Sequence, residues 1–355
     1  MIDRREFIGG CAAFAAAGCR SARRVRREDA VRAELRRQID GGLMAGCVCG
    51  IVGGALFAAG ERTRHPSSSP MTADCIFDLA SVGKTFTASL CARLVADGRL
   101  DPDAPFTDYL PEHVLAKENC SITVRDLATH TGGFDNSKPY ILPDPEAFDR
   151  ALYAKRPVRP RGERYEYACS NFIYLGRIVE RVTGTDLESA ARTLLWQPLG
   201  MDDTCWHEVV GNPRAVETFT NGRLPPGTHG DESARANPRA TGNGSAFSTA
   251  GDMLKFAGDL LSRRTFPKAY YDLLLTPCYE KGGVRRSFGW DMGAGLHRPP
   301  GWSAATVAHG GFTGNTVAVD PAHGFAGVVL TNRTGDRLKA YAGQGRLLAL
   351  MSETL

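Results

Sequence analysis

The sequence predicts an α/β (α+β) fold: one antiparallel sheet flanked by N- and C-terminal helices, with a mostly helical lobe inserted into it. Short apolar and β-branched runs occur at both ends of the chain, whereas roughly residues 85–250 are mostly helix and loop. The 355 residues, 43% hydrophobic and 23% charged, suffice for one large domain or two closely packed ones. We therefore expect a discontinuous sheet lobe, a helical lobe and a cleft between them.

The first thirty residues have the composition of an export signal followed by a tether. Arg4-Arg5 precedes an apolar run that is too short to cross a bilayer, since that requires about 20 residues. An arginine pair in this position is typical of twin-arginine export, and Ala16-Ala17-Gly18-Cys19 resembles a bacterial lipobox. We expect residues 1–18 to be the export signal, Cys19 to carry lipid, and residues 19–30 to tether an exported, periplasmic or cell-surface protein to a membrane.

The positive charge of the chain is confined to its N-terminal segment. Residues 1–27 hold seven arginines against two acidic residues, a net of +5, whereas the whole chain carries +4. Residues 28–355 therefore carry about −1, and the folded body has no basic bias. We expect no nucleic-acid partner and membrane contact only through the N-terminal lipid anchor. The sequence leaves the oligomeric state open.

Eight cysteines, from Cys47 to Cys278, follow the signal without a pattern typical of a metal site. They are scattered, several lie in apolar runs, and neither C-x-x-C nor H-E-x-x-H occurs. Disulfides and buried free thiols are both open for an exported protein. We expect no metal and no cofactor, with Cys47 and Cys49 on one face of a buried strand.

Hydrophobic periodicity and glycine stops predict the elements of residues 31–355. The strands are short apolar or β-branched runs: 44–52, 55–59, 306–308, 315–320 and 325–331. The internal helices have apolar residues at helical spacing: 81–97, 170–183 and 251–261. Two further helices, over 32–41 and 337–355, flank the strands. The sheet lobe is thus expected to comprise residues 31–80 and 251–355, and the helical lobe residues 81–250.

Ser81 and Lys84 form the first candidate catalytic motif. Residues three apart on a helix share a face, so Lys84 Nζ can reach Ser81 Oγ and help to remove its proton. A serine at a helix N-terminus also directs its backbone N–H toward the oxyanion of an attacked carbonyl. The spacing S-x-x-K by itself is equally typical of an N-cap serine followed by a solvated lysine. Whether the motif is catalytic therefore has to be judged from the surrounding sequence.

Three segments together closely resemble the β-lactamase-related serine hydrolases. They are Phe77–Lys84 (FDLASVGK), Leu94–Asp101 (LVADGRLD) and Ile122–Gly133 (ITVRDLATHTGG). That family includes class C β-lactamases, DD-peptidases, D-aminopeptidases and serine esterases, and the resemblance runs from about Met44 to Arg333. It implies a β-lactamase/transpeptidase-like fold and an acyl-enzyme on Ser81.

The resemblance also implies a Tyr-x-Asn motif just before a helix, and two alignments compete for it. Asn171 has Cys169, not a tyrosine, two residues before it. Alignment on the flanking glycine and Leu-Gly segments instead puts Tyr167 at the tyrosine position and Cys169 at the asparagine position, and we adopt it. Tyr167, with its pKa lowered by Lys84, would act as general base or relay a proton to the leaving group. Because a thiol hydrogen-bonds an amide poorly, Cys169 weakens the case for tight peptide or β-lactam positioning.

The third motif is His309-Gly310-Gly311, followed by Phe312. It resembles the family strand that lines the cleft opposite the serine, where glycines let a substrate backbone approach closely. The resemblance implies that the backbone N–H of Phe312 is the second oxyanion donor. His309 stands where class C β-lactamases carry lysine and where some DD-peptidases and D-aminopeptidases carry histidine.

These motifs predict a serine hydrolase acting on a small-molecule or peptidoglycan-fragment substrate. We expect ester or amide hydrolysis first, a DD-carboxypeptidase or D-aminopeptidase second, and an efficient β-lactamase third. An inactive cell-wall-binding homologue is the alternative of another class, and the joint presence of Ser81, Lys84 and Tyr167 opposes it. The G-x-S-x-G elbow of α/β-hydrolases is matched poorly, because residues 301–305 lack the final glycine and precede a strand.

Overall fold

The computed structural model describes residues 25–142, 144–219, 224–293 and 297–355. The expected export signal over 1–18 and the expected lipidation site Cys19 lie outside the described residues. No helix in the described part of the chain combines the length and the apolar character that crossing a bilayer requires.

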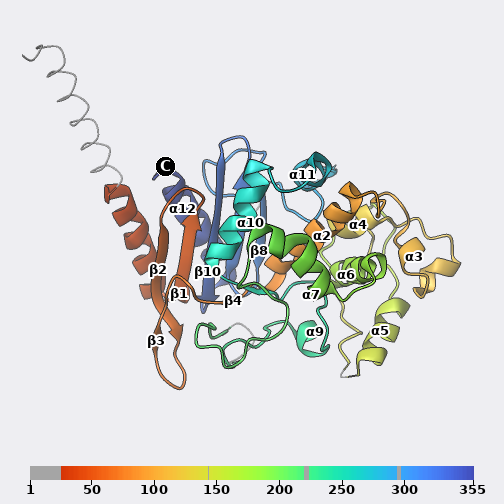
Figure 1. Cartoon of the computed structure of the whole chain (residues 1–355), viewed down its shortest axis with the longest axis horizontal. Helices are drawn as coiled ribbons and strands as arrows, with labels where there is room; N and C mark the ends of the chain where they lie inside the picture. The colour runs from red at the N-terminus through yellow and green to blue at the C-terminus, as the bar shows by residue number, and fades with distance from the viewer. Residues whose placement is uncertain (1–24, 143, 220–223, 294–296) are drawn as a thin grey trace, which may run out of the picture.

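A six-stranded antiparallel sheet joins the two ends of the chain, which confirms the predicted fold class (Figure 1). The strand order is β3-β2-β1-β10-β9-β8. Because β1 pairs with both β2 and β10, the N-terminal hairpin and the C-terminal strands belong to one sheet. The strands of this sheet are β1 (Met44–Ile51), β2 (Leu56–Thr63), β3 (Ser69–Pro70), β8 (Val307–Gly311), β9 (Asn315–Asp320) and β10 (Phe325–Arg333).

The remaining elements form the helical lobe and two small ribbons. The ribbons are β4 (Phe77–Asp78) with β5 (Phe247–Ser248), and β6 (Tyr279–Lys281) with β7 (Val284–Arg286). The helices that follow helical residues 25–40 are η1 (Ala80–Gly83), α2 (Lys84–Ala96), α3 (Phe106–Tyr109), η2 (Val114–Lys117), α4 (Val124–Thr129), α5 (Pro145–Ala154), α6 (Cys169–Thr183), α7 (Leu187–Ala191), η3 (Arg192–Trp196), α8 (Gln197–Leu199), α9 (Glu232–Arg235), α10 (Ala250–Ser262), α11 (Lys268–Leu275) and α12 (Arg337–Ser352).

Helices cover both faces of the sheet, because the central strand β1 is apolar on both (Figure 1). All eight residues of β1 are buried. Cys47 and Cys49 belong to the core beneath helical residues 25–40 and α12, whereas Val48 belongs to the core that α10 covers. This alternation is what the pleat of a strand buried on both faces requires.

The helical lobe is built around α2, which crosses its centre (Figure 1). Phe86 on this helix packs edge-on against Trp196, Trp206 and Phe256, with ring centroids 5.2 to 6.3 Å apart. Because α10, which carries Phe256, also packs on the sheet, this aromatic cluster fixes the helical lobe against the sheet lobe. The nucleophile candidate Ser81, in η1 directly before α2, is therefore attached to a rigid element.

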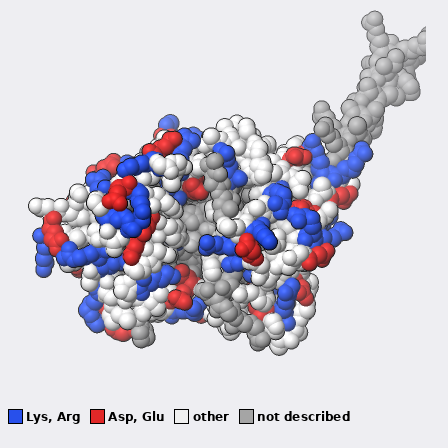
Figure 2. All heavy atoms as spheres, turned by 180° about the vertical axis from the view of Figure 1, so that it is seen from behind, with Lys and Arg blue, Asp and Glu red and all other residues white. Residues whose placement is uncertain are grey.

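The charged side chains of the described residues match the nearly neutral folded body that the sequence predicted. Lysine, arginine and acidic side chains are interspersed over the face shown in Figure 2.

All eight cysteines from Cys47 to Cys278 are free thiols, and six of them are buried. Of the two possibilities that the sequence left open, the described residues thus contain buried thiols and no disulfide.

Candidate active site

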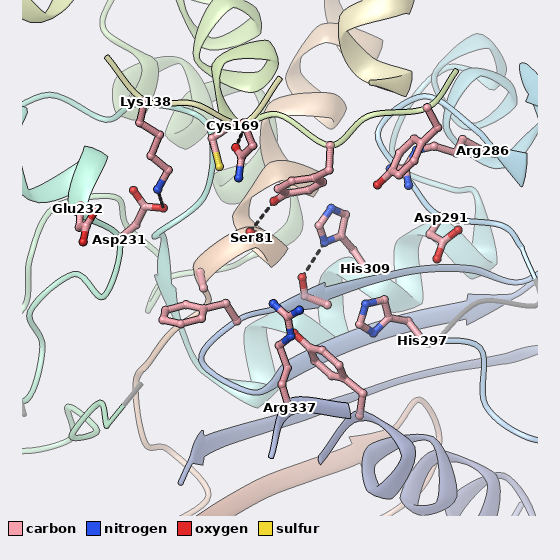
Figure 3. Close-up of a pocket in the computed structure, with 17 residues that line it drawn as sticks. Ser81, Lys138, Cys169, Asp231, Glu232, Arg286, Asp291, His297, His309 and Arg337 are labelled. Carbon is pink, nitrogen blue, oxygen red and sulfur yellow. Dashed lines mark hydrogen bonds and ion pairs between the residues drawn. The ribbon is translucent and has the colours of Figure 1, made fainter. Parts of the chain in front are cut away.

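A cleft of about 620 Å³ brings together three segments that lie far apart in the sequence (Figure 3). The turn η1 contributes Ser81, the segment leading into α6 contributes Tyr167 and Cys169, and the end of β8 contributes His309 and Gly310, with Phe312 just beyond. Lys84 is completely buried beneath this lining. The structure therefore assembles the residues that the sequence singled out for catalysis in one place.

Ser81 lies between the two side chains predicted to act on it. Its Oγ is 2.7 Å from the phenol oxygen of Tyr167 and 3.2 Å from Lys84 Nζ. Asn171, the competing alignment, turns away from the cleft, and its side-chain amide donates to His130 Nδ1 at 3.0 Å. The geometry brings Tyr167, and not Asn171, to the serine.

Lys84 is a buried cation stabilised by dipoles and aromatic faces. Its Nζ donates to Ser81 Oγ and to the backbone carbonyl of Asn243, and it lies 3.9 Å from Cys169 Sγ. The rings of Tyr167 and Phe172 flank it, with centroids 4.9 and 5.8 Å away. No carboxylate within the described residues forms an ion pair with it. The positive charge is thus free to act on Ser81 and on a bound substrate.

The pKa of Tyr167 is raised, and the prediction that Lys84 lowers it is wrong. Complete burial disfavours the charged phenolate, and the neighbouring Cys169 thiol adds to the rise. The hydrogen bond with Ser81 acts in the opposite direction but does not outweigh burial. Lys84 Nζ contacts the face of the phenol ring instead of its oxygen. Tyr167 is therefore a neutral phenol at neutral pH.

His309 is neutral as well, so it offers the cleft an acceptor and no positive charge. Its burial, reinforced by the charges of Lys84 and Arg286, lowers its pKa well below the usual range. Nδ1 lies 3.0 Å from the carbonyl oxygen of Gly310. Because a carbonyl oxygen only accepts, we assign the proton to Nδ1, which leaves Nε2 as the acceptor.

The turn that carries Ser81 is held in an unusual backbone conformation. The helix predicted from residue 81 begins instead as the 3₁₀ turn η1, whose first residue, Ala80, has a φ of +46°. A left-handed conformation costs a residue with a side chain roughly 1 kcal/mol or more. The N–H of Ala80 donates to Asp78 Oδ1 at 2.9 Å, and its carbonyl accepts from the N–H of Ser245 at 2.9 Å. These two bonds keep the turn in place.

The same bonds orient one backbone donor toward the cleft. In a trans peptide the N–H points opposite to the carbonyl, so the N–H of Ser81 points away from Ser245. Within the described residues no hydrogen bond uses this N–H. It is therefore free to stabilise an oxyanion, as the position of the serine predicted.

A second donor arises in the same way at the end of β8. The carbonyl of Gly311 accepts from the hydroxyl of Tyr341 at 2.9 Å and from the N–H of Gly314 at 2.8 Å. The N–H of Phe312 therefore points the opposite way, and no hydrogen bond of the described residues uses it. Gly311 packs so tightly on the serine turn that a Cβ would overlap the carbonyl oxygen of Leu79. Only a glycine at position 311 lets the end of β8 lie this close to the serine turn.

Asp78 is a positioning residue that the sequence reasoning missed. It is buried, and besides Ala80 its carboxylate accepts the N–H of Gly230 at 2.6 Å. Its backbone carbonyl accepts from the side chains of Thr313 and Asn315 at 2.9 and 2.8 Å. Asp78 thus ties the serine turn to two other walls of the cleft. The acidic residue inside the apolar run FDLA was the signal that could have identified it.

Both ends of the cleft carry charged residues that the sequence did not single out (Figure 3). At one end Lys138 Nζ lies 3.8 Å from Asp231, with Glu232 beside them. The other end, beyond His309, is lined by Arg286, Asp291 and His297, whereas Arg337, on α12, lines the cleft between the two ends. These residues come from loops and elements with no recognisable motif, so only the folded chain reveals them.

Known proteins resemble this chain in sequence over most of its length. A family model described as Beta-lactamase matches residues 30–351. The Esterase EstB of Burkholderia gladioli is 30% identical over 312 residues, which are 74% of this chain and 79% of that protein. A putative D-alanyl-D-alanine carboxypeptidase of Escherichia coli (strain K12) is 24% identical over 308 residues, 74% of this chain and 70% of that protein.

A solved structure shares the fold over nearly the whole chain. EstCE1, a hydrolase with promiscuous acyltransferase activity, has a TM-score of 0.78 at 20% sequence identity, covering 93% of this chain and 99% of its own. At this identity the likeness establishes the fold alone.

We expect Gly311→Ala to slow labelling of Ser81 by a fluorophosphonate probe about 100-fold, the usual effect of losing an oxyanion donor. The added Cβ would overlap the Leu79 carbonyl, so β8 would move away from the serine turn. Gly251→Ala is the matched control, because its Cβ makes only an ordinary contact on α10. Labelling rates and thermal melts of both variants check this, and wild-type labelling by Gly311→Ala would contradict it.

Proposed function

Because this chain belongs to the beta-lactamase family of serine hydrolases, we propose that Ser81 forms an acyl-enzyme and that the protein hydrolyses esters. The observation that carries the proposal is the position of Ser81 Oγ, within hydrogen-bond distance of both Tyr167 and Lys84 in an open cleft. The two unused N–H groups of Ser81 and Phe312 supply the oxyanion site.

In this proposal Tyr167 relays the proton of Ser81. As Oγ attacks the carbonyl carbon, the serine proton passes to the phenol oxygen of Tyr167 while the phenol proton passes to the leaving-group oxygen. The phenol is neutral before and after the step, so its raised pKa is no obstacle. The Lys84 ammonium stabilises the negative charge that develops on Oγ and on the oxyanion.

Deacylation follows the same path in reverse. A water molecule takes the place of the leaving group and gives its proton to Tyr167 Oη, and the phenol proton returns to Ser81 Oγ as the acyl bond breaks. The products are a carboxylic acid and the regenerated serine.

Cys169 favours esters over amides as substrates. Its side chain stands beside Lys84 at the place where the family's asparagine amide would contact a substrate amide. The backbone N–H of Cys169 already donates a hydrogen bond to Asn136 Oδ1 at 2.9 Å, and the thiol is a weak hydrogen-bonding group. The N–H of a substrate amide would therefore lose its hydrogen bond to water on binding without a good replacement, whereas an ester has no N–H that needs a partner.

Two alternatives stay open for the substrate. A DD-carboxypeptidase or D-aminopeptidase activity on cell-wall fragments is favoured by the similarity to the E. coli carboxypeptidase, and β-lactam hydrolysis ranks below it. An inactive cell-wall-binding homologue is the candidate of another class. The short contacts of Ser81 with Tyr167 and Lys84 oppose it, because a protein that only binds has no need of them.

For the location of the protein, we propose export and a lipid anchor on Cys19. The support is the sequence alone: the arginine pair at residues 4 and 5 and the Ala-Ala-Gly-Cys motif that ends at Cys19. An anchor there would hold the cleft in the periplasm or at the cell surface, where cell-wall fragments are found.

The proposal predicts turnover of a p-nitrophenyl ester that depends on Ser81. Wild type should hydrolyse this ester faster than a D-Ala-D-Ala peptide or a chromogenic cephalosporin, and Ser81→Ala should fall to the rate of buffer because the nucleophile is gone. Parallel steady-state assays measure this. Ester turnover in Ser81→Ala would overturn the mechanism, and wild type that no acylating probe labels would favour the binding alternative.

Cys169→Asn should shift the preference from ester toward peptide. A restored amide at this position adds hydrogen bonds to a substrate amide, each worth about 0.5–1.5 kcal/mol, so we expect the peptide-to-ester ratio of kcat/KM to rise up to about tenfold. Cys120→Asn, a half-buried cysteine outside the cleft, is the control. An unchanged ratio in Cys169→Asn would remove Cys169 from the determinants of specificity.

The proposed relay predicts a flat pH profile near neutrality. The raised pKa of Tyr167 keeps its proton in place to above pH 10, and the lowered pKa of His309 keeps it neutral from below its usual value of 6.5 upward. Neither group titrates between about pH 7 and 9, so kcat/KM for a neutral ester should be level there. A tenfold rise per pH unit, lost in Tyr167→Phe, would show instead that the phenolate is the active form.

A further inference from the structure

Lys155 is a buried cation that lies outside the cleft but holds a segment that lines it. Its side chain is only 4% exposed, and it stands at the C-terminal end of α5. Three acceptors surround its ammonium, as many as it has N–H groups. Nζ donates to Asp135 Oδ1 at 2.6 Å, to Ser137 Oγ at 2.7 Å and to the carbonyl of Ser137 at 3.0 Å. The charge of Lys155 is therefore used on one short turn, residues 135–137.

This turn depends on Lys155 for its position. Within the described residues, no backbone-to-backbone hydrogen bond involves Asp135, Asn136 or Ser137. The hydroxyl of Ser137 donates to Asp135 Oδ1 at 2.6 Å, which closes the turn on itself. In the same part of the chain, the hydrogen bonds that tie the turn to other segments are the three from Lys155 and one at the side chain of Asn136. Without the lysine, little would fix the turn.

Asn136, at the centre of this turn, lines the cleft and contacts the start of α6. Its Oδ1 accepts the backbone N–H of Cys169 at 2.9 Å. Cys169 is the first residue of α6, and the N-cap residue Ala168 has no side chain that could accept a hydrogen bond. The first N–H groups of a helix need acceptors from outside the helix. Asn136 therefore supplies from another segment an acceptor that the N-cap residue lacks.

The capped start of α6 determines where Tyr167 lies. On one side of this tyrosine, the N–H of Glu166 donates to the carbonyl of His130 at 2.9 Å. On the other side, two residues along, the N–H of Cys169 is held by the turn. The proposed relay requires the phenol oxygen of Tyr167 to stay 2.7 Å from Ser81 Oγ. A looser attachment at Cys169 would let the phenol move away from the serine.

We propose that Lys155 is a positioning residue for the reaction of Ser81: it fixes Asn136, which caps α6 and thereby holds Tyr167 at the serine. The inference rests on the proposed function, because that function gives Tyr167 the proton relay. Hydrogen bonds from an ammonium are about twice as strong as those between neutral groups, so the lysine fixes the turn more firmly than a neutral donor would. Precise placement matters here, because a misplacement of about 1 Å can slow a reaction about 100-fold.

Lys155→Met should lower kcat for p-nitrophenyl acetate about tenfold and change KM less than about twofold, because Tyr167 serves both acylation and deacylation. Active sites are counted by complete labelling with a fluorophosphonate, so that kcat refers to folded enzyme. Lys155→Arg keeps the charge and should recover part of the loss. Arg177→Met is the matched control: Arg177 is also on 4% of its side-chain surface exposed, but on α6 it pairs with Asp149 and Glu180, outside the cleft. The control should melt earlier and keep the wild-type kcat and KM.

Variants of Asn136 then test the route by which Lys155 acts. Asn136→Ala removes the cap and should lower kcat about as much as Lys155→Met does. Because both changes would loosen the same contact, the double variant should lose no more than either single one, whereas independent losses would multiply to about 100-fold. Asn136→Asp keeps an acceptor oxygen at the helix start and should keep most of the wild-type kcat.

Each result decides a separate point. An active wild type together with an unchanged kcat in Lys155→Met would overturn the positioning role and leave the proposed function standing, whereas a wild type that neither hydrolyses the ester nor is labelled would overturn the proposed function itself. Losses that multiply in the double variant, or an equal loss in Arg177→Met, would overturn the proposal in favour of a general loss of stability. If Lys155→Met does not fold, Asp135→Asn takes its place: a wild-type kcat there overturns the proposal, and a lowered kcat that Asn136→Ala does not lower further supports it.

Discussion

The site depends on how closely the backbone around Ser81 packs against two glycines. Gly311 on β8 and Gly244 in the loop before β5 leave no room for a Cβ next to the carbonyl oxygens of Leu79 and Ala80. Hydrogen bonds then fix the carbonyls of Ala80 and Gly311, so the peptide N–H groups that follow them point the other way. If either glycine contact were loosened, neither the position of Ser81 Oγ nor the direction of the two backbone N–H donors would be fixed.

Burial decides the electrostatics of this site. Lys84 Nζ lies beneath Ser81, surrounded by a carbonyl and aromatic faces. The same burial raises the pKa of Tyr167 and lowers that of His309, because both charged forms would lose water without gaining an adequate partner. A neutral phenol between a serine and a leaving group can pass protons without accumulating charge, which is why a relay suits this geometry better than a phenolate base.

The charged and hydrogen-bonding side chains that line the cleft bear on the question of which relatives share the activity of this chain. Cys169 stands beside Lys84 in the cleft, and Arg286 lines the cleft farther along, beyond His309. The chain shares its fold with a hydrolase and matches an esterase and a carboxypeptidase in sequence, so the family alone does not select a substrate. We propose that such a selection is made by the groups at the two ends of the cleft, which differ in charge and hydrogen bonding.

The sequence by itself determined the fold class, the position of Ser81 and Lys84 on one turn, and the choice of Tyr167 over Asn171. These follow from local spacing and from motifs that short stretches of chain carry. Tertiary structure decided the rest: the 3₁₀ turn with its left-handed Ala80, the raised pKa of Tyr167 and the hydrogen bonds by which Asp78 holds the serine turn. Each of these depends on burial and on partners that lie tens to hundreds of residues away, and a linear sequence does not show which groups lose their water together.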